Sequence, residues 1–385
     1  MPMELSLPDL PSGMASLSDF RLAAQRRLPH FAFEYLDGGI GRDVGLARNY
    51  SAMDRVRLTP EIRDAGPEPD ASTELLGRRW ALPFGVAPVG LSGLFHPHAA
   101  RMLAARATKL NLPFCLSVVS TDSTESVARD AGRPPWQQLY WPRDADVQND
   151  ILARMKALDV DTLMPTVDIP GWQWRERSVR AGSTGAPTAM MKLKAVLSRP
   201  GWALAQARRG PPGFPNFAPY VTGGPAAIEQ WMFRETLRQV GVEEMKSLRD
   251  RWHGKIIVKG VMSPKDAEAF AAIGMDGIVV SNHGGRQLDA APAGVELLPP
   301  IVDAVKGKIA ILADGGIADG LDVLRMLRLG ADFVLVGRLP YYAMGGLGDR
   351  GVGALDLLAL QVRAVMTQLG IAKLDELASI KMDLD

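Results

Sequence analysis

This chain of 385 residues contains a single cysteine, Cys115. One cysteine excludes an intramolecular disulfide and any paired-cysteine metal site, and this usage fits a reducing compartment. Cys115 lies in the apolar run Pro113-Phe114-Cys115-Leu116. The run predicts a buried, structural thiol.

An excess of charge of one sign is also lacking. The 44 basic and 43 acidic residues leave a net charge of +1, so no overall field favours nucleic acid or an anionic membrane. The N-terminus, residues 1–13, lacks the basic flank and apolar centre of a signal peptide. No run reaches the roughly 18–20 continuous apolar residues that cross a bilayer. We therefore expect a cytoplasmic protein with no nucleic-acid partner.

The chain does have a recurring rhythm of short apolar runs, each of which ends in polar or glycine-rich residues. Helical patterns follow most of these runs, and strands that alternate with helices indicate a parallel sheet. Eight such strands suggest a closed (β/α)8 TIM barrel of the α/β class. The runs are 84–88, 114–118, 137–141, 162–166, 256–259, 277–281, 310–313 and 333–336.

Two regions lie outside this rhythm. Residues 1–80 are predicted to form an N-terminal extension, with a helix at 18–27, that packs on the barrel of residues 81–385. Residues 177–224 form a long loop after strand 4, with many Pro, Gly and basic residues around an apolar centre. Loops of this length are usually functional. A lid, a packed excursion and a peripheral contact with the inner face of the membrane are all compatible with its composition.

The stretch from Ser281 to Asp289, SNHGGRQLD, follows the sixth apolar run directly. His283 offers a general base near neutral pH, and Arg286 offers a planar fork of donors that matches a carboxylate. The two glycines between them allow a sharp turn and a close approach to a ligand. The alternative is an ordinary strand-to-helix loop with a capping histidine. The pair predicts proton abstraction from a substrate that carries a carboxylate.

The other strand ends carry polar side chains as well. Since the active site of such a barrel lies at the carboxyl ends of the strands, these residues should meet there. The glycines of Asp314-Gly315-Gly316 and of Gly337-Arg338 follow strands seven and eight, the usual phosphate site of the fold. No residues here have the spacing of a metal site. The remaining strand-end residues are Ser117, Gln138, Tyr140, Thr166, Asp168 and Lys259.

With these residues in place, the chain closely resembles the family of FMN-dependent L-2-hydroxy-acid dehydrogenases and oxidases. The family includes glycolate oxidase, L-lactate dehydrogenase and (S)-mandelate dehydrogenase. The resemblance runs from Leu28-Pro29-His30 to Gly337-Arg338, and the stretch 281–289 is its signature. It implies an enzyme that oxidises an L-2-hydroxy acid to the 2-oxo acid, and it implies a homotetramer.

The resemblance also implies a role for each site residue. His283 would be the catalytic base and Asp168 its partner. Arg286 and Arg175 would bind the substrate carboxylate, and Tyr35 and Tyr140 would contact the substrate as further catalytic residues. The implied FMN-binding residues are Pro88, Val89, Gly90, Ser117, Gln138, Thr166, Lys259 and Ser281, with Asp314, Gly316, Gly337 and Arg338 at the phosphate.

One position departs from the family pattern. Close relatives usually carry an arginine two residues after the last glycine of the Asp-Gly-Gly segment, and this chain has Ala318 there, followed by Asp319. One cationic partner of the phosphate is therefore missing. We still expect FMN to bind, through Arg338 and backbone donors.

Two positions bear on the reaction and the substrate. Gly90 stands where the family's oxidases usually have alanine and its lactate and mandelate dehydrogenases commonly have glycine. Val119 stands where glycolate oxidase has a bulky aromatic residue, which leaves room for a lactate- or mandelate-like side chain. We expect a dehydrogenase that passes electrons to a quinone or another carrier. The alternatives are an oxidase that uses oxygen and produces hydrogen peroxide, or a non-catalytic flavin- or phosphate-binding barrel.

Overall fold

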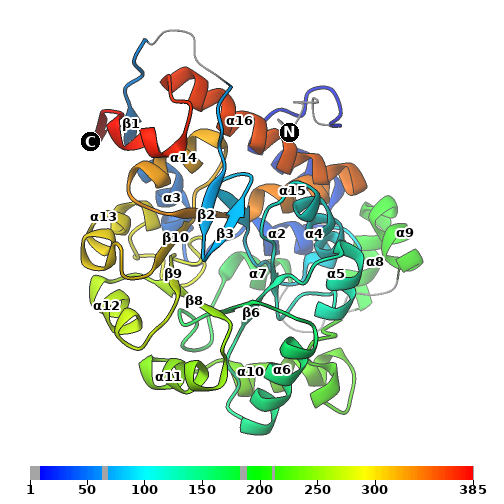
Figure 1. Cartoon of the computed structure of the whole chain (residues 1–385). Coiled ribbons are helices and arrows are strands. Elements are labelled where there is room, and N and C mark those ends of the chain that lie inside the picture. The colour runs from blue at the N-terminus through cyan, green and yellow to red at the C-terminus, as the bar shows by residue number, and fades with distance from the viewer. Residues whose placement is uncertain (1–8, 63–67, 183–188, 210–212, 385) are drawn as a thin grey trace.

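The computed structural model describes residues 9–62, 68–182, 189–209 and 213–384 (Figure 1). At its centre an eight-stranded parallel sheet has the order β4-β11-β10-β9-β8-β7-β6-β5. A bridge between Val86 and Phe114 joins the two end strands and closes the barrel. The predicted (β/α)8 barrel is confirmed, and all eight predicted strands are present. They are β4 (Phe84–Val86), β5 (Cys115–Ser117), β6 (Trp136–Leu139), β7 (Thr162–Pro165), β8 (Lys255–Val261), β9 (Gly277–Val280), β10 (Ala310–Asp314) and β11 (Phe333–Val336).

Alternate residues of each strand face the inside of the barrel and the surrounding helices, as the two-residue period of a strand requires. In β9, Val279 belongs to the small inner cluster, and its neighbours Ile278 and Val280 belong to the large outer core. The inner cluster also contains Cys115, which is 1% exposed. Burial raises the pKa of its thiol far above the ordinary value. Cys115 is therefore a structural residue, as expected.

Helices surround the barrel and connect its strands. Their starts follow the sequence signals: Ser263 accepts a hydrogen bond from the Asp266 N–H, and Pro264 occupies the first position of α12. Gly274 and Gly330 adopt positive φ after α12 and α14, where they end the helical turns. The helices are α4 (Ala99–Lys109), α5 (Thr124–Ala131), α6 (Ala145–Ala157), α11 (Val242–Arg251), α12 (Pro264–Ala272), α13 (Gly294–Val305), α14 (Gly320–Arg328), α15 (Arg338–Leu347) and α16 (Ala354–Leu369).

The segment before β4 consists of three helices and short strands. They are α1 (Leu17–Arg27), α2 (His30–Asp37), α3 (Val44–Asp54), β1 (Val56–Leu58), β2 (Thr73–Leu75) and β3 (Arg78–Trp80). Helix α1 packs on α15, and β1 pairs with β12 (Met382–Leu384) near the C-terminus. Trp80 of β3 meets Trp136 edge to face at 5.9 Å and joins the inner cluster of the barrel. The sequence did not predict these short strands, because three residues carry too little pattern.

The connection after β7 differs from the irregular loop that we expected at 177–224. Its described residues include α7 (Glu176–Ala181), α8 (Ala189–Ser198), α9 (Pro200–Arg209) and the start of α10 (Pro225–Thr236). Pro200 opens α9, where a proline does not disturb a helix. Trp202 donates to the Leu94 carbonyl, and Gln206 donates to the Gly93 carbonyl. These bonds hold α9 on the barrel.

Within the described part of the chain, one helical run, Arg338–Leu369, is long and apolar enough to cross a membrane by length and composition alone. The run contains α15 and α16, which are separated by a 3-10 segment, Gly348–Gly353. Every residue from Leu339 to Gly345 is buried in the fold. A core helix passes the same test, and this run is packed as one.

Candidate active site

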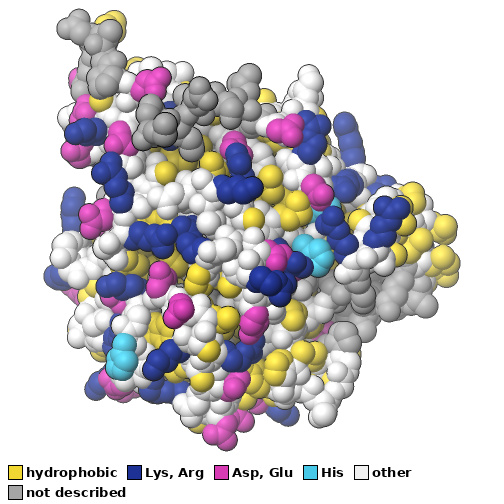
Figure 2. Space-filling model, turned by 45° about the vertical axis from the view of Figure 1, so that its right-hand side comes forward, with side chains coloured by type: hydrophobic (Ala, Val, Ile, Leu, Met, Phe, Trp, Pro, Cys, Tyr) yellow, Lys and Arg dark blue, Asp and Glu magenta, His cyan; other side chains and the backbone are white. Residues whose placement is uncertain are grey.

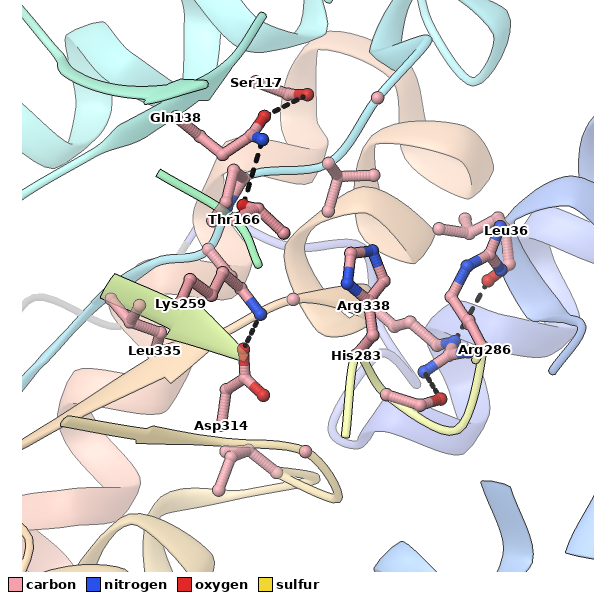
Figure 3. Close-up of a pocket in the computed structure, with 18 of the residues that line it drawn as sticks. Leu36, Ser117, Gln138, Thr166, Lys259, His283, Arg286, Asp314, Leu335 and Arg338 are labelled. Carbon is pink, nitrogen blue, oxygen red and sulfur yellow. Dashed lines mark hydrogen bonds and ion pairs between the residues drawn. The ribbon is translucent and has the colours of Figure 1, made fainter. Parts of the chain in front are cut away.

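One cavity opens at the carboxyl ends of the barrel strands (Figure 3). Residues from the ends of all eight barrel strands line it, together with residues of the N-terminal helices α2 and α3. Of the eighteen residues predicted for the site, all line this cavity except Asp168 and Ser281, which lie directly behind lining residues. The lining members are Tyr35, Pro88, Val89, Gly90, Ser117, Gln138, Tyr140, Thr166, Arg175, Lys259, His283, Arg286, Asp314, Gly316, Gly337 and Arg338.

His283 follows β9 in a tight left-handed turn. Its φ is +57°, and Gly284 and Gly285 continue the turn with φ of +64° and +75°. Such values are easy for glycine and cost a histidine roughly 1 kcal/mol, which the surrounding contacts must offset. The Ser281 hydroxyl accepts a hydrogen bond from the His283 N–H and supports the turn. The motif therefore aims the His283 side chain into the cavity instead of along a helix.

Asp168 holds the His283 ring from behind. His283 Nδ1 lies 3.0 Å from Oδ1 and 3.1 Å from Oδ2 of Asp168. Since an ionised carboxylate only accepts, Nδ1 carries the proton and Nε2 is the free basic atom. Gly260 makes room for this contact: its φ is +99°, and a Cβ there would lie 2.5 Å from Asp168.

Charge keeps this pair in the form that a base requires. Burial lowers the pKa of His283 below its usual value, although Asp168 opposes the shift. Burial alone would raise the pKa of Asp168, but His283 and Lys259 lower it below its usual value. At neutral pH the histidine is therefore neutral and Asp168 is ionised.

Two arginines face the same cavity without an acidic partner. Arg286 donates to the carbonyls of Tyr35 (2.9 Å) and Gly38 (2.6 Å), and Arg175 donates to the Arg286 carbonyl (3.2 Å). Among the described residues, neither forms an ion pair with a carboxylate. Burial lowers the pKa of Arg286 to about 9, and the charges of Arg175 and Arg338 act in the same direction. Positive charges held together in this way call for an anion.

Arg177 behaves differently from Arg175, although only two positions separate them. Its guanidinium pairs with Glu34, Asp37 and Asp43 and ties α7 to the N-terminal helices. Both arginines are therefore engaged, Arg175 at the cavity and Arg177 in an ion-pair network.

Lys259 is 4% exposed and reaches the cavity from β8. Its Nζ lies 2.8 Å from Asp314 Oδ2 (Figure 3). It also donates to the Ser281 hydroxyl at 2.8 Å. Burial lowers the pKa of Lys259, but Asp314 and Asp168 outweigh burial and raise it. The ammonium is therefore charged, with one of its three donors left for a ligand. Ser281 acts here through Lys259 and does not line the cavity.

A chain of hydrogen bonds orients the neighbouring wall. Ser117 Oγ donates to Gln138 Oε1 and Gln138 Nε2 donates to Thr166 Oγ1, both at 3.0 Å (Figure 3). This order fixes the Gln138 amide and leaves its second N–H free. The wall thus presents an oriented donor next to the Lys259 ammonium.

The far end of the cavity has the features of a phosphate site. Gly315 and Gly316 have φ of +95° and +83°, and a Cβ at Gly316 would lie 2.3 Å from the Asn49 carbonyl oxygen. Only glycine fits this turn. Gly337 precedes α15, and Arg338 begins it. These are the turns after the seventh and eighth barrel strands.

An unpartnered atom tests whether a flavin nucleotide fits. Asp314 Oδ2 is held by Lys259, whereas Asp314 Oδ1 is buried without a hydrogen-bond partner. Because a buried carboxylate oxygen requires a donor, a ligand hydroxyl group is needed at this point. A ribityl chain between the Lys259 wall and the glycine turns would supply one. The residues present therefore fit FMN.

Several lining residues were not predicted from the sequence. Tyr50 and Leu36 come from the N-terminal helices, and neither position has a local signal for a site. Trp172 and Trp174, which follow β7, do not line the cavity: they are 51% and 59% exposed, and Trp172 packs edge to face on Phe233. Among the described residues no group of three or more His, Cys, Asp or Glu could hold a metal ion.

Fold and cavity together define a (β/α)8 barrel with one large site at its carboxyl end. The site holds a histidine paired with a carboxylate, two arginines that have no acidic partner among the described residues, and a glycine turn. The model of the FMN-dependent dehydrogenase family matches residues 24–383. The chain belongs to this family and uses FMN.

Known proteins agree with this assignment. L-lactate dehydrogenase from Caulobacter sp. (strain K31) is 40% identical over 369 residues, which cover 94% of this chain and 97% of the relative. L-lactate dehydrogenase from Ectopseudomonas mendocina (strain ymp) is 38% identical over 371 residues, 95% of this chain and 98% of the relative. The crystal structure of mandelate oxidase superposes with a TM-score of 0.81 at 33% identity and covers 96% of this chain and 98% of its own.

Proposed function

We propose that this enzyme oxidises an L-2-hydroxy acid to the 2-oxo acid, with FMN as the immediate electron acceptor. The observation that carries the proposal is the arrangement of His283 with two arginines. His283 lines a cavity in which Arg175 and Arg286 have no acidic partner among the residues that the structure describes. A base beside a carboxylate site is what the oxidation of a 2-hydroxy acid requires.

Each of these residues has a separate role in the proposed reaction. Arg286 and Arg175 bind the substrate carboxylate, and this fixes the α-carbon between the flavin site and His283. Nε2 of His283 takes a proton from the substrate, and Asp168 stabilises the imidazolium that results. FMN, held in the same cavity, would accept the two electrons and the second hydrogen of the substrate. The Lys259 ammonium favours the negative charge that accompanies reduction.

For the acid, we propose a lactate- or mandelate-like substrate. Val119, Tyr35 and Tyr140 line the cavity near Gly90, and a valine leaves more space there than an aromatic residue. Burial raises the pKa of Tyr140 well above its usual value, so its hydroxyl remains a donor to substrate. Relatives named for lactate and mandelate support this class.

For the acceptor, we propose a dehydrogenase that passes electrons from FMN to a quinone or another carrier. Two observations support it: Gly90 lines the cavity, and the curated relatives at 38–40% identity are named L-lactate dehydrogenases. An oxidase that makes hydrogen peroxide is the second candidate, favoured by the superposition on mandelate oxidase.

The test is anaerobic mixing of the purified yellow protein with L-lactate, (S)-mandelate and glycolate. Bleaching of the flavin absorbance by lactate or mandelate is expected, and His283→Gln should bind FMN normally but bleach at least about 100-fold more slowly. Wild-type protein that no 2-hydroxy acid bleaches would remove the proposed activity. Stoichiometric peroxide in air, with no preference for a dye acceptor, would assign an oxidase instead.

We also propose that the enzyme is a cytoplasmic homotetramer that touches the inner face of the membrane through α8 and α9. These helices expose Met190, Leu193, Val196, Leu197 and Leu204, each at least 49% exposed. Figure 2 shows hydrophobic side chains beside Lys and Arg at the right-hand edge, where Figure 1 places these helices. Mixed apolar and basic surfaces bind anionic bilayers.

Two measurements test these points. Leu193→Glu with Leu197→Glu should abolish sedimentation with anionic vesicles and leave flavin reduction by substrate unchanged. Equal sedimentation of variant and wild type would contradict the membrane contact. Sedimentation velocity of the full chain would give the number of subunits.

A further inference from the structure

The phosphate end of the cavity is poor in positive charge. Four cationic residues besides His283 line the cavity among the described residues, namely Arg175, Lys259, Arg286 and Arg338. Arg175 and Arg286 lie at the carboxylate site, and Lys259 is paired with Asp314. Arg338 is therefore the cation left, among these described lining residues, for a phosphate group.

Arg338 is itself largely occupied. Its guanidinium donates to the carbonyls of Leu36 and Gly284, both at 3.0 Å (Figure 3). It also donates to the Gly38 carbonyl at 3.2 Å. A guanidinium has five N–H donors, so two remain. A phosphate dianion has three terminal oxygens, each of which accepts more than one hydrogen bond. Arg338 alone does not saturate them.

The loop between β10 and α14 adds no positive side chain. Ala318 is apolar, and its N–H donates to Asp322 at 2.8 Å. The Asp319 carboxylate caps α14 by accepting from the N–H groups of Leu321 and Asp322. Asp322 is in turn paired with Arg325 at 2.8 Å. Ala318, Asp319 and Asp322 are not among the described residues that line the cavity, so this side adds no cation for a phosphate.

Helix α3 delivers a hydroxyl group to the same place. Asn49 and Asn282 exchange two amide hydrogen bonds, of 3.0 and 2.8 Å, and so clamp α3 to the signature loop. The Asn49 carbonyl lies directly against Gly316. Tyr50 is the next residue, and it lines the cavity together with Gly315, Gly316 and Arg338.

The Tyr50 hydroxyl has no hydrogen-bond partner in the part of the chain that the structure describes. No hydrogen bond of the described residues uses Tyr50 Oη. The contrast is Tyr342, a fully buried tyrosine whose hydroxyl donates to Asp37 at 2.8 Å. Burial raises the pKa of Tyr50, although Arg338 opposes the shift, so Oη remains a protonated donor. A tyrosine that served only to fill the core would not need to face the cavity.

We propose that Tyr50 Oη donates a hydrogen bond to the phosphate of FMN beside Arg338, and so makes Tyr50 a residue that selects the phosphorylated cofactor. The proposal rests on the FMN site described above and assigns to α3 a role in cofactor specificity. Tyr50 thus gives the phosphate a neutral donor on the cavity wall that it shares with Gly316 and Arg338, at an end of the cavity where Ala318 supplies no cation.

The experiment compares FMN with riboflavin, which lacks the phosphate. Full-length protein is freed of cofactor and titrated with each flavin, and quenching of flavin fluorescence gives the Kd. Three proteins are used: wild type, Tyr50→Phe, and Tyr220→Phe as the matched control. Tyr220→Phe likewise removes a tyrosine hydroxyl. That hydroxyl contacts Asp150 and Arg154, and Tyr220 does not line the cavity.

Tyr50→Phe should raise the Kd for FMN about 10- to 100-fold, the range for a hydrogen bond to a charged group, and leave the Kd for riboflavin within twofold. Tyr220→Phe should change neither. Weakening of both flavins equally would make Tyr50 a packing residue and overturn the proposal, as would an unchanged Kd for FMN. Wild-type protein that binds no FMN would instead overturn the proposed function itself, and this inference with it.

Discussion

His283 Nδ1 lies 3.0 Å from Asp168 Oδ1, and Asp168 occupies the space that Gly260 leaves by having no side chain. Asp168 follows β7 and His283 follows β9, so the histidine is held by a partner from a different loop. This contact sets the tautomer of the ring. The same pair shows how charge and burial balance. Burial lowers the pKa of the ring, and the carboxylate limits the fall.

Asp168→Asn should therefore change the pH dependence as well as the rate. Without the carboxylate, the pKa of His283 falls further and the imidazolium loses its stabilisation. We expect kcat to fall about 10²- to 10⁴-fold. In wild type, kcat/KM should rise with pH through a pKa below 6.5 and level off near neutrality. In the variant this rise should lie at lower pH, and an unshifted profile would contradict the role of Asp168.

Arg175→Lys tests the carboxylate site. The lysine keeps the charge but loses the planar fork and the bond to the Arg286 carbonyl. We expect KM for the acid to rise about 10- to 100-fold, with a smaller effect on kcat. Arg177→Lys is the control: one ammonium cannot keep all three contacts with Glu34, Asp37 and Asp43, so the change should lower the Tm and leave KM nearly unchanged. A raised KM in Arg177→Lys together with an unchanged KM in Arg175→Lys would contradict the role proposed for Arg175.

Gly90→Ala probes the wall in front of the flavin site. A Cβ at this position would lie 2.6 Å from Val119 Cγ2 and 3.0 Å from the Tyr35 hydroxyl oxygen. The valine must therefore move, and the acid pocket must narrow. In Gly90→Ala we expect KM for mandelate to rise more above its wild-type value than KM for lactate does, because the larger acid needs this space. An altered rate of peroxide formation in air would show that the same position controls access of oxygen.

Asp322→Asn tests the acidic side of the phosphate site. Burial, aided by the charge of Asp319, raises the pKa of Asp322 from 3.8 to about 6. A raised pKa in the folded state means that the stability from this group is fully present below about pH 4 and is lost as pH rises through about 6. The Tm of wild type should thus fall relative to that of the variant between pH 4 and pH 7.5, by at least about 2 °C. A constant difference in Tm would rule out this titration.

Short-range pattern was enough to predict the barrel. The two-residue period and apolar character of each strand are local properties, and so are the proline and glycine signals at helix ends, such as Pro264 and Gly274. The connection at 177–224 was expected to be irregular because its glycines, prolines and basic residues obscure helical periodicity. The structure forms helices there, since Trp202 and Gln206 find carbonyl partners on the barrel.

The sequence by itself determined which side chains are candidates for the site: His283 and Arg286 share one nine-residue stretch, and the other polar residues end buried strands. The tertiary structure decided which of them work together. It separated Arg175 from Arg177, placed Ser281 behind Lys259, and brought Tyr50 to Gly316. The physical reason is distance along the chain: Asn49 and Asn282 are 233 residues apart, and only packing of α3 against the β9 loop sets their contact.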